Sequence, residues 1–312
     1  MSLSDLGIEG YESKTLIIDG DILIYQPCCI FNEDTDVDRA QIIKYVNKKI
    51  DRLMVSADCD KYIMFVTTKT NFRDFIVDDY KAHREEIVRP VNLAWAKRWC
   101  ANNLNTHYHQ QLEADDLLGI HMNDSTVLWS IDKDLRQIPG RHLDDETGKV
   151  IEITEIGKLY EYEVKSKTTG KSKKKVYFDG TVGFHYQLLV GDSTDNIVGC
   201  GKREVATYKS GSKKGQEYFS RKGVGSGEAV KVLTSAILNR GDKEPLQATL
   251  DTVIHHYKNV FGDDWQRNLE TQANLLYMVR EQYGNVIKRW TYDGRDEYFC
   301  LELGVILDDY TP

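Results

Sequence analysis

Acidic residues gather in four short motifs of this chain, and their chemistry gives the first indication of function. Each motif places two or three carboxylates within four residues. The motifs are IIDGD with Asp19 and Asp21, LEADDLL with Glu113, Asp115 and Asp116, SIDKD with Asp132 and Asp134, and GDSTDNI with Asp192 and Asp195. Clustered carboxylates beside apolar segments are costly unless a cation neutralises them. Oxygen ligands of this kind suit Mg²⁺ or Mn²⁺, and two such ions about 3.5–4 Å apart are a device for in-line attack on a phosphodiester.

Each motif alone also has a structural interpretation. DGD fits a turn at the end of a strand, LEADD the first turn of a helix, SIDKD a capping segment and GDSTDN a Gly/Asp turn. All four occur in this order, each after or at the start of a regular element. Together they favour a metal site over four unrelated turns.

The elements that must position these motifs are short apolar segments, two of which end in carboxylates. TLIIDGDILIY (Thr15–Tyr25), YIMFVTT (Tyr62–Thr68) and STVLWSID (Ser125–Asp132) have the pattern of buried parallel strands. Helical patterns over Arg39–Val55 and Leu112–Met122 alternate with them. This alternation predicts an α/β fold with a doubly wound, mostly parallel sheet, in which ligands bind beyond the carboxyl ends of the strands. Helical periodicity after about residue 221 predicts a C-terminal helical part.

Composition indicates a globular protein with one basic region. The chain has 312 residues, 41% of them hydrophobic, and a formal charge of −8, which excludes a disordered or collagen-like chain. Between Glu161 and Lys222, thirteen Lys/Arg face only seven Asp/Glu. Most of these basic residues lie in two segments, Val164–Val176 and Lys202–Lys222, each of which we expect to be a hairpin or a loop. On charge alone, polyanion binding and a solvated surface remain equally good interpretations.

The cysteines indicate a reducing compartment, and the apolar runs are too short for a membrane span. The six cysteines form no CxxC pair, which favours free thiols, and the His107/His109 and His255/His256 pairs lack partners at zinc-finger spacing. No apolar run reaches about 18 residues, and the first residues do not form a signal peptide. We therefore expect a cytoplasmic protein, in the host cytosol if a phage encodes it, with no membrane partner.

In their order, the motifs IIDGD, FRDFIVDDYKAHR, LEADD, SIDKD and GDSTDNI resemble those of the structure-specific 5′ nucleases. This family includes flap endonucleases, the 5′-nuclease domains of bacterial DNA polymerases and phage 5′→3′ exonucleases. The resemblance extends over roughly Thr15–Leu233, and YKAHR, LEADD and the late KSGSKKGQE are most similar to the phage exonucleases. It implies a PIN-like catalytic core in residues 1–190. Residues 191–312 would form a helix-hairpin-helix and a C-terminal helical region, with a basic insertion at 202–222.

The resemblance also implies the activity, the ions and the partners. The activity is Mg²⁺-dependent hydrolysis of phosphodiesters, as a 5′→3′ exonuclease or a flap endonuclease, on DNA with 5′ ends, nicks or flaps, with RNA–DNA hybrid as a further substrate. Two Mg²⁺ ions are implied, with Mn²⁺ as a substitute and K⁺ as an additional ion at the helix-hairpin-helix. Asp19 would hold metal indirectly. The first metal site matches Glu113, Asp115, Asp116 and Asp132, with Asp21 as a further ligand, and the second matches Asp132 or Asp134 with Asp192 and Asp195.

Basic and aromatic positions follow from the same resemblance. Lys81 and Arg84 in YKAHR match the pair that meets the scissile phosphate, although a solvated helix is the alternative. Arg73 in NFRDF is a weaker catalytic candidate. Tyr25 matches a position on which a terminal base stacks, with core packing as the alternative. The remaining candidates for DNA binding are Lys202, Lys209, Lys213, Lys214, Gly223, Gly225 and Gly227.

Two departures from the family pattern bear on these expectations. Thr67-Thr68-Lys69 stands where an acidic ligand is expected, so either the first metal site is weaker or Asp21 compensates. The basic insertion also separates DNIVGCG from GVGSGEAVKVL, which the family writes as one compact segment.

Two other functions fit parts of the pattern. In a haloacid-dehalogenase-type phosphatase, Asp19 would be the nucleophile, but Leu23 is atypical and LEADD has no role. A DNA-end binding protein with weak or no catalysis would explain the missing acidic residue near Thr68.

Overall fold

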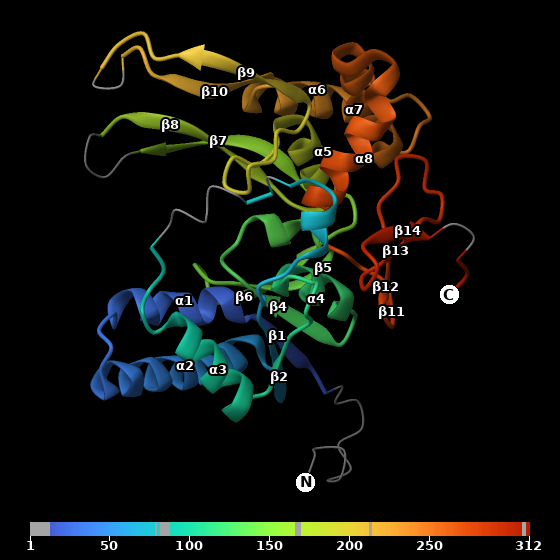
Figure 1. Ribbon diagram of the computed structural model, residues 1–312. Helices are drawn as coiled ribbons and strands as arrows, with labels where there is room; N and C mark the ends of the chain where they lie inside the picture. Colours follow the sequence, from blue (N-terminus) through green and yellow to red (C-terminus); the bar gives the residue numbers. More distant parts are fainter. Residues whose placement is uncertain (1–12, 79, 82–87, 166–169, 212–213, 308–309) are drawn as a thin grey trace. The chain divides into compact units, whose positions relative to one another are not determined.

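The computed structural model describes residues 13–78, 80–81, 88–165, 170–211, 214–307 and 310–312 (Figure 1). The chain forms two compact units. The first unit comprises Met1–Asn71, Ile87–Ile153 and Met278–Gln282, and the second comprises Phe72–Glu86, Thr154–Tyr277 and Tyr283–Pro312. Along the described residues, no helix combines the length and apolarity needed to cross a membrane.

The first unit is built on a six-stranded sheet. Its strands are β1 (Thr15–Asp19), β2 (Lys61–Phe65), β3 (Thr106–His107), β4 (Thr126–Trp129), β5 (Gly140–Asp144) and β6 (Lys149–Ile153). Their order is β3-β2-β1-β4-β5-β6, and all neighbours run parallel except β5 and β6. In the register of the sheet, Ile17 of β1 lies between Ile63 and Leu128. The three predicted strands are therefore central neighbours, and their carboxyl ends share one edge.

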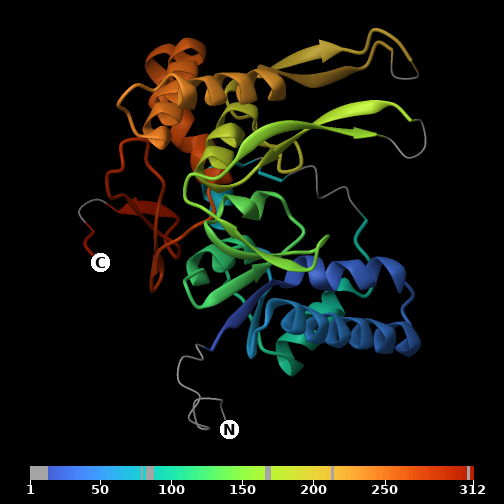
Figure 2. The ribbon, with the colours of Figure 1, turned by 180° about the vertical axis from the view of Figure 1, so that it is seen from behind.

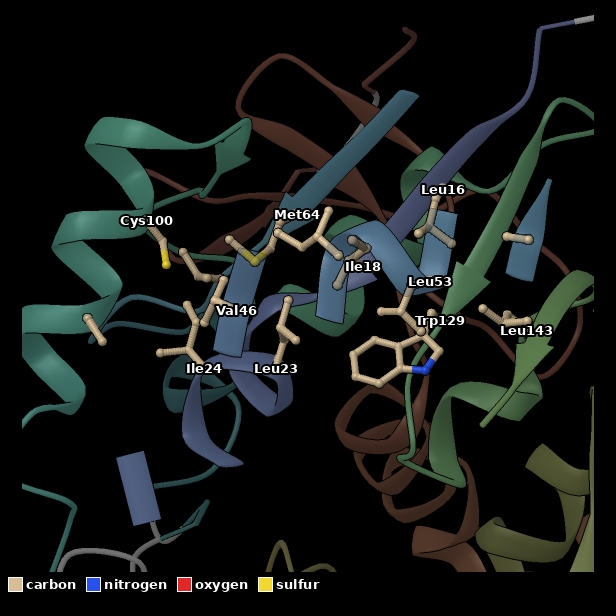
Figure 3. Packing of buried hydrophobic residues seen from close by; sticks show 14 of the residues in the cluster. Leu16, Ile18, Leu23, Ile24, Val46, Leu53, Met64, Cys100, Trp129 and Leu143 are labelled. Carbon is tan, nitrogen blue, oxygen red and sulfur yellow. The ribbon is translucent and has the colours of Figure 1, made fainter. Parts of the chain in front are cut away.

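Helices cover both faces of this sheet. They are α1 (Gly20–Ile30), α2 (Asp36–Ala57), α3 (Leu93–Asn103) and α4 (Ala114–His121), and the short 3-10 helix η4 (Asp134–Gln137) follows β4. Leu16, Ile18 and Trp129 point to the face on which α1, α2 and α3 pack (Figure 3). Alternate residues point to the other face, where α4 packs on β1 and β2 and the ring of Phe65 meets that of His121. The predicted α/β class with a doubly wound, mostly parallel sheet is confirmed.

The second unit contains four helices and two long hairpins. The helices are α5 (Gly180–Val190), α6 (Ser226–Leu238), α7 (Pro245–Phe261) and α8 (Trp265–Leu276), and the short 3-10 helices are η2 (Phe72–Phe75) and η5 (Gly262–Asp264). The hairpins are β7 (Leu159–Lys165) with β8 (Ser172–Phe178), and β9 (Gly201–Thr207) with β10 (Glu217–Gly223). The C-terminal helical part and the hairpins at the two basic segments are confirmed. Short strands of a further sheet follow, and the sequence did not predict them: β11 (Gln282–Tyr283), β12 (Val286–Lys288), β13 (Tyr298–Cys300) and β14 (Val305–Leu307).

The division into units differs from the boundary after residue 190 that the sequence predicted. The reason is α5, which is apolar on nearly every side and packs on α6, α7 and α8. A helix buried all round needs neighbours on every face. It therefore belongs with the C-terminal helices, and the part of the first unit that precedes it in the chain ends with β6.

Two buried histidines make stability depend on pH. His185 of α5 pairs its Nδ1 with the Thr249 hydroxyl at 2.8 Å, and Nε2 of His142 in β5 donates to the Ile138 carbonyl at 2.7 Å. Burial lowers the pKa of each to about 4. Both are neutral in the folded protein, whereas the unfolded chain binds protons below about pH 6.5. The stability that these buried neutral histidines allow is fully present above about pH 6.5 and is lost as the pH falls towards 4.

We expect His142→Gln and His185→Gln each to flatten the fall in unfolding free energy between pH 6.5 and 4. Each wild-type histidine costs up to about 3 kcal/mol over this range. Urea unfolding at several pH values measures the effect, and His107→Gln, at an exposed position, is the control. A pH profile identical to wild type for both buried variants would contradict the prediction.

Candidate functional site

Asp19 is the acidic residue at the end of the central strand. Its carboxylate caps α1, accepting from the Ile22 amide at 3.2 Å, and its other oxygen accepts from the Ser130 hydroxyl at 2.7 Å. The residue is only 2% exposed. Burial, together with the charges of Asp21 and Asp132, raises the pKa of Asp19 to about 7, although the two hydrogen bonds act to lower it. Asp19 is thus a buried acid, and among the described residues no cation pairs with its ionised form.

Gly20 allows α1 to start directly at this edge. A Cβ on Gly20 would lie 2.6 Å from the Phe65 carbonyl oxygen, so any larger residue would push α1 away from β2. The glycine of IIDGD therefore keeps Asp19 and Asp21 beside the end of β2.

Asp21 has a cationic partner that the sequence did not predict. The Lys97 ammonium, from α3, lies 2.5 Å from its Oδ1 and also donates to the Thr67 carbonyl at 3.0 Å. The Thr67 amide donates to both Asp21 oxygens at 3.2 Å. In the sequence, Lys97 has no distinguishing signal because lysine is ordinary on an amphipathic helix.

Thr67, where an acidic ligand was expected, joins two elements. Its hydroxyl accepts from the Ala114 amide at 2.9 Å, which links the end of β2 to the first turn of α4. Thr68 donates its hydroxyl to the carbonyls of His109 and Gln110. Both threonines satisfy local backbone groups, and compensation by Asp21 stays a prediction.

LEADD forms the start of α4, as its structural interpretation predicted. Glu113 is the N-cap, and its amide donates to Oδ2 of Asp116 at 3.2 Å. Oδ1 of Asp116 accepts from the Val279 amide at 3.2 Å, and Asp116 is fully buried. Asp116 therefore has a structural function whatever else it binds, whereas Asp115 is half-buried on the first turn of the helix.

SIDKD is a compact turn after β4. The Ser130 hydroxyl accepts from the Asp132 amide at 2.9 Å and donates to Asp19, so it ties the two acids together. Oδ1 of Asp132 accepts from the Asp134 amide at 2.9 Å, and Asp134 pairs with Lys133 at 3.4 Å. Ser130 is a second positioning residue that the sequence did not reveal.

The first unit thus brings Asp19, Asp21 and Asp132 to one edge of the sheet. Across the residues that the structure describes, no three His, Cys, Asp or Glu side chains form a ready-made metal-binding group. Mg²⁺ keeps several waters and is commonly held by only one or two carboxylates. The repulsion at buried Asp19 is what a cation would relieve, so these donors fit a hydrated divalent ion.

The second unit holds Asp192 and Asp195 in a Gly/Asp turn after α5. Gly191 has φ +68°, and a Cβ there would lie 2.3 Å from the Ile197 carbonyl. Asp192 accepts from the Thr194 amide at 2.6 Å. Asp195 pairs with the Lys81 ammonium at 3.3 Å, and its carbonyl accepts from the Lys81 amide. Lys81 is thus held beside a candidate metal ligand, and Arg84 lies outside the described residues.

Arg73 is a correction to the sequence prediction. It is 1% exposed, and its guanidinium donates to the carbonyls of Leu275 at 3.1 Å and Tyr277 at 2.8 Å. These carbonyls lie at the C-terminal end of α8, where they lack helical partners and where a cation is favoured. Arg73 therefore caps α8 and has a structural role instead of a catalytic one.

The remaining candidates differ in their surroundings. Tyr25 is 42% exposed on α1, so the core-packing interpretation is wrong. Lys209 and Lys214 are exposed in the β9–β10 connection, Lys202 lies over the Phe261 ring at 5.8 Å, and Lys213 is outside the described residues. Base and phosphate contacts for these residues stay predictions.

The glycines before α6 do not form a free phosphate site. Gly223 ends β10 and Gly225 caps α6. The carboxylate of Glu161 lies 3.2 Å from where a Cβ of Gly227 would be, so an anion of the chain already sits beside this helix terminus. α5 and α6 pack together, with β9–β10 inserted between them in the chain, and the helix-hairpin-helix stays a prediction.

Comparison with known proteins gave structural matches only. No protein-family model matches the chain, and no curated protein is a significant sequence match. The D15 protein of phage T5, co-crystallised with metal ions, is 14% identical with a TM-score of 0.47, covering 85% of this chain and all of that one. A variant of the bacteriophage T5 D15 flap endonuclease, in a pseudo-enzyme–product complex with DNA and metal ions, is 14% identical with a TM-score of 0.45, covering 84% and 99%. At this identity, residue roles depend on the geometry of this chain.

We expect Asp19→Asn to raise the melting temperature in chelator at pH 8, because it removes a buried charge with which no cation in the described part of the chain pairs. The difference should shrink as the pH falls below 7, where the folded protein binds a proton at Asp19, and should vanish only near pH 4, where the unfolded chain binds it too. Mg²⁺ should raise the melting temperature of wild type by mass action and that of the variant much less. Thermal unfolding checks this, with the exposed Asp124→Asn as control. An equal Mg²⁺ shift in both proteins would contradict a metal at Asp19.

Proposed function

We propose that this protein is a divalent-metal-dependent nuclease that hydrolyses phosphodiesters near the 5′ ends of DNA. The observation that carries the proposal is buried Asp19, repelled by Asp21 and Asp132, at the carboxyl ends of adjacent parallel strands. Ligands bind at this edge in α/β sheets. The order of the acidic motifs supports the same class, and the D15 flap endonuclease of phage T5 is itself seen with DNA and metal ions.

Asp19, Asp132 and the first turn of α4 are the groups that would hold the ion. A bound divalent ion lowers the pKa of a coordinated water and polarises a phosphoryl oxygen. Ser130 fixes the positions of Asp19 and Asp132, because its hydroxyl bonds to both. Lys97 neutralises Asp21 and so limits the negative charge that an incoming phosphate meets.

The structure disfavours covalent catalysis by Asp19. A nucleophile must reach the substrate with a free oxygen, but Asp19 is 2% exposed and accepts a hydrogen bond on each oxygen. We therefore propose that water attacks, and that the phosphatase alternative does not apply. The second ion, at Asp192 and Asp195 with Asp132 or Asp134, is supported by the family resemblance alone, as are the preference for nicks or flaps and the use of RNA–DNA hybrids.

Asp132→Ala should reduce cleavage of end-labelled DNA to less than about a tenth of the wild-type rate in saturating Mg²⁺. Loss of a metal ligand removes several kcal/mol of transition-state stabilisation, whereas DNA affinity measured in Ca²⁺ should be unchanged. Asp124→Ala is the matched control. Substantial turnover by Asp132→Ala would sink the metal assignment.

Lys81→Ala should lower the single-turnover rate by about 10²-fold, the loss seen when one electrostatic donor to a transition state is removed. Lys81→Arg keeps the charge and should retain more activity. Comparison of melting temperatures separates this role from a structural one through Asp195. An unchanged cleavage rate in Lys81→Ala would leave the lysine with a structural role only.

A further inference from the structure

The β7–β8 hairpin carries chemically different side chains on its two faces. Residues directly opposite in an antiparallel pair share a face, and neighbours along a strand alternate. Tyr160 lies opposite Tyr177, and Tyr162 lies opposite Lys175. Lys173, opposite Val164, belongs to the same face. We call this set the tyrosine face: Tyr160, Tyr162, Val164, Lys173, Lys175 and Tyr177.

The three rings of the tyrosine face form an ordered, accessible row. Tyr177 is anchored by its hydroxyl, which donates to Asp179 at 2.7 Å. Tyr160 stacks on Tyr177, with ring centroids 5.0 Å apart and planes 16° apart, and Tyr162 meets Tyr160 edge-on at 6.3 Å. Tyr160 is 47% exposed and Tyr162 41%. The far end of the β7–β8 hairpin projects beyond the helices of its unit (Figures 1 and 2).

Charge is segregated between the faces. Lys173 and Lys175 are exposed, and among the described residues neither has a carboxylate partner. The carboxylates of the hairpin strands, Glu161 and Glu163, lie on the opposite face with Lys174, which pairs with Glu161 at 2.9 Å. Glu161 also lies beside Gly227 of α6, so the tyrosine face points away from that helix.

We propose that the tyrosine face binds single-stranded nucleic acid, with bases stacking on Tyr160 and Tyr162 and phosphates beside Lys173 and Lys175. Stacking on aromatic rings flanked by cations is how proteins hold single strands without reading sequence. A duplex keeps its base faces inside the helix and cannot offer them to these rings. The positive charge of this face favours a polyanion over an apolar protein partner. Binding here needs no metal and no hydrolysis, so it goes beyond the proposed nuclease activity.

Fluorescence anisotropy with labelled oligo-dT and oligo-U, on the full chain in chelator, tests the proposal. Tyr162→Ala should weaken binding by about 5- to 100-fold, the range for one lost stack. The double variant Tyr160→Phe/Tyr162→Phe keeps both rings and should stay within about twofold of wild type. Tyr283→Ala, an exposed tyrosine of the separate sheet, is the matched control and should have no effect. The two oligomers distinguish a DNA site from an RNA site.

The lysines give an independent measurement. Lys173→Gln/Lys175→Gln should reduce the dependence of log affinity on log salt by about 1.4, since each phosphate contact on a single strand contributes about 0.7. Lys174→Gln, on the opposite face, should leave that slope unchanged.

The competing interpretation is that the tyrosines only stabilise the hairpin. It predicts a lower melting temperature for Tyr160→Ala with unchanged affinity in Tyr162→Ala, which leaves the Tyr160–Tyr177 stack intact. Affinity of Tyr162→Ala equal to wild type, or no binding of either oligomer by wild type, would overturn the proposal. Oligomer binding that depends on Tyr162 in a wild type that cleaves no DNA would contradict the nuclease alone, whereas cleavage with unchanged affinity in Tyr162→Ala would contradict this site alone.

Discussion

The cost of a carboxylate buried at the end of a central strand organises the first unit. β1 lies between β2 and β4, so a side chain directly after it is surrounded by protein on several sides. An ionised acid there is tolerated only if hydrogen-bond donors or cations face it. Asp19 accepts hydrogen bonds from the Ile22 amide and the Ser130 hydroxyl. The nearby Asp21 is paired with the Lys97 ammonium. The start of α1, the turn after β4 and the position of α3 all follow from that requirement.

In both units, a lysine ammonium group neutralises a partly buried carboxylate of an acidic motif. Lys97 faces Asp21 in the first unit, and Lys81 faces Asp195 in the second. Each pair is partly buried, with side-chain exposures of 27% and 31% for the first and 17% and 21% for the second. In a partly buried pair, removal of the cation destabilises the fold by more than the intact pair stabilises it, because the carboxylate is left without a partner. The lysines therefore keep the acidic motifs compatible with folding while no metal is bound.

The sequence predicted the strands, which depend on local residue patterns, but it missed contacts between residues that are far apart in the chain. Apolar runs identified β1, β2 and β4, and acids at the ends of β1 and β4 marked where two of these strands stop. Lys97 and Ser130 gave no signal because their residue types are ordinary at their positions and only the tertiary fold brings them to Asp19 and Asp21. Arg73 was misassigned for the same reason: its partners, the carbonyls at the end of α8, are some 200 positions away in the chain. Strands as short as β11 and β14 carry too few residues for a pattern.

The strand register decides which face of each basic hairpin carries positive charge. A count of charges along the sequence does not show this. Both lysine-rich segments have a net positive charge in the sequence, yet Lys174 is paired with Glu161 and Lys222 with Glu204. Surface pairs of this kind contribute little stability, but each removes a charge from the face on which it lies. In β7–β8 the two-residue alternation puts the paired charges on one side and the unpaired lysines on the other, next to the tyrosines. A shift of one residue in the pairing would move Lys173, Lys175 and Tyr177 to the face of the two glutamates and take both lysines away from Tyr160 and Tyr162.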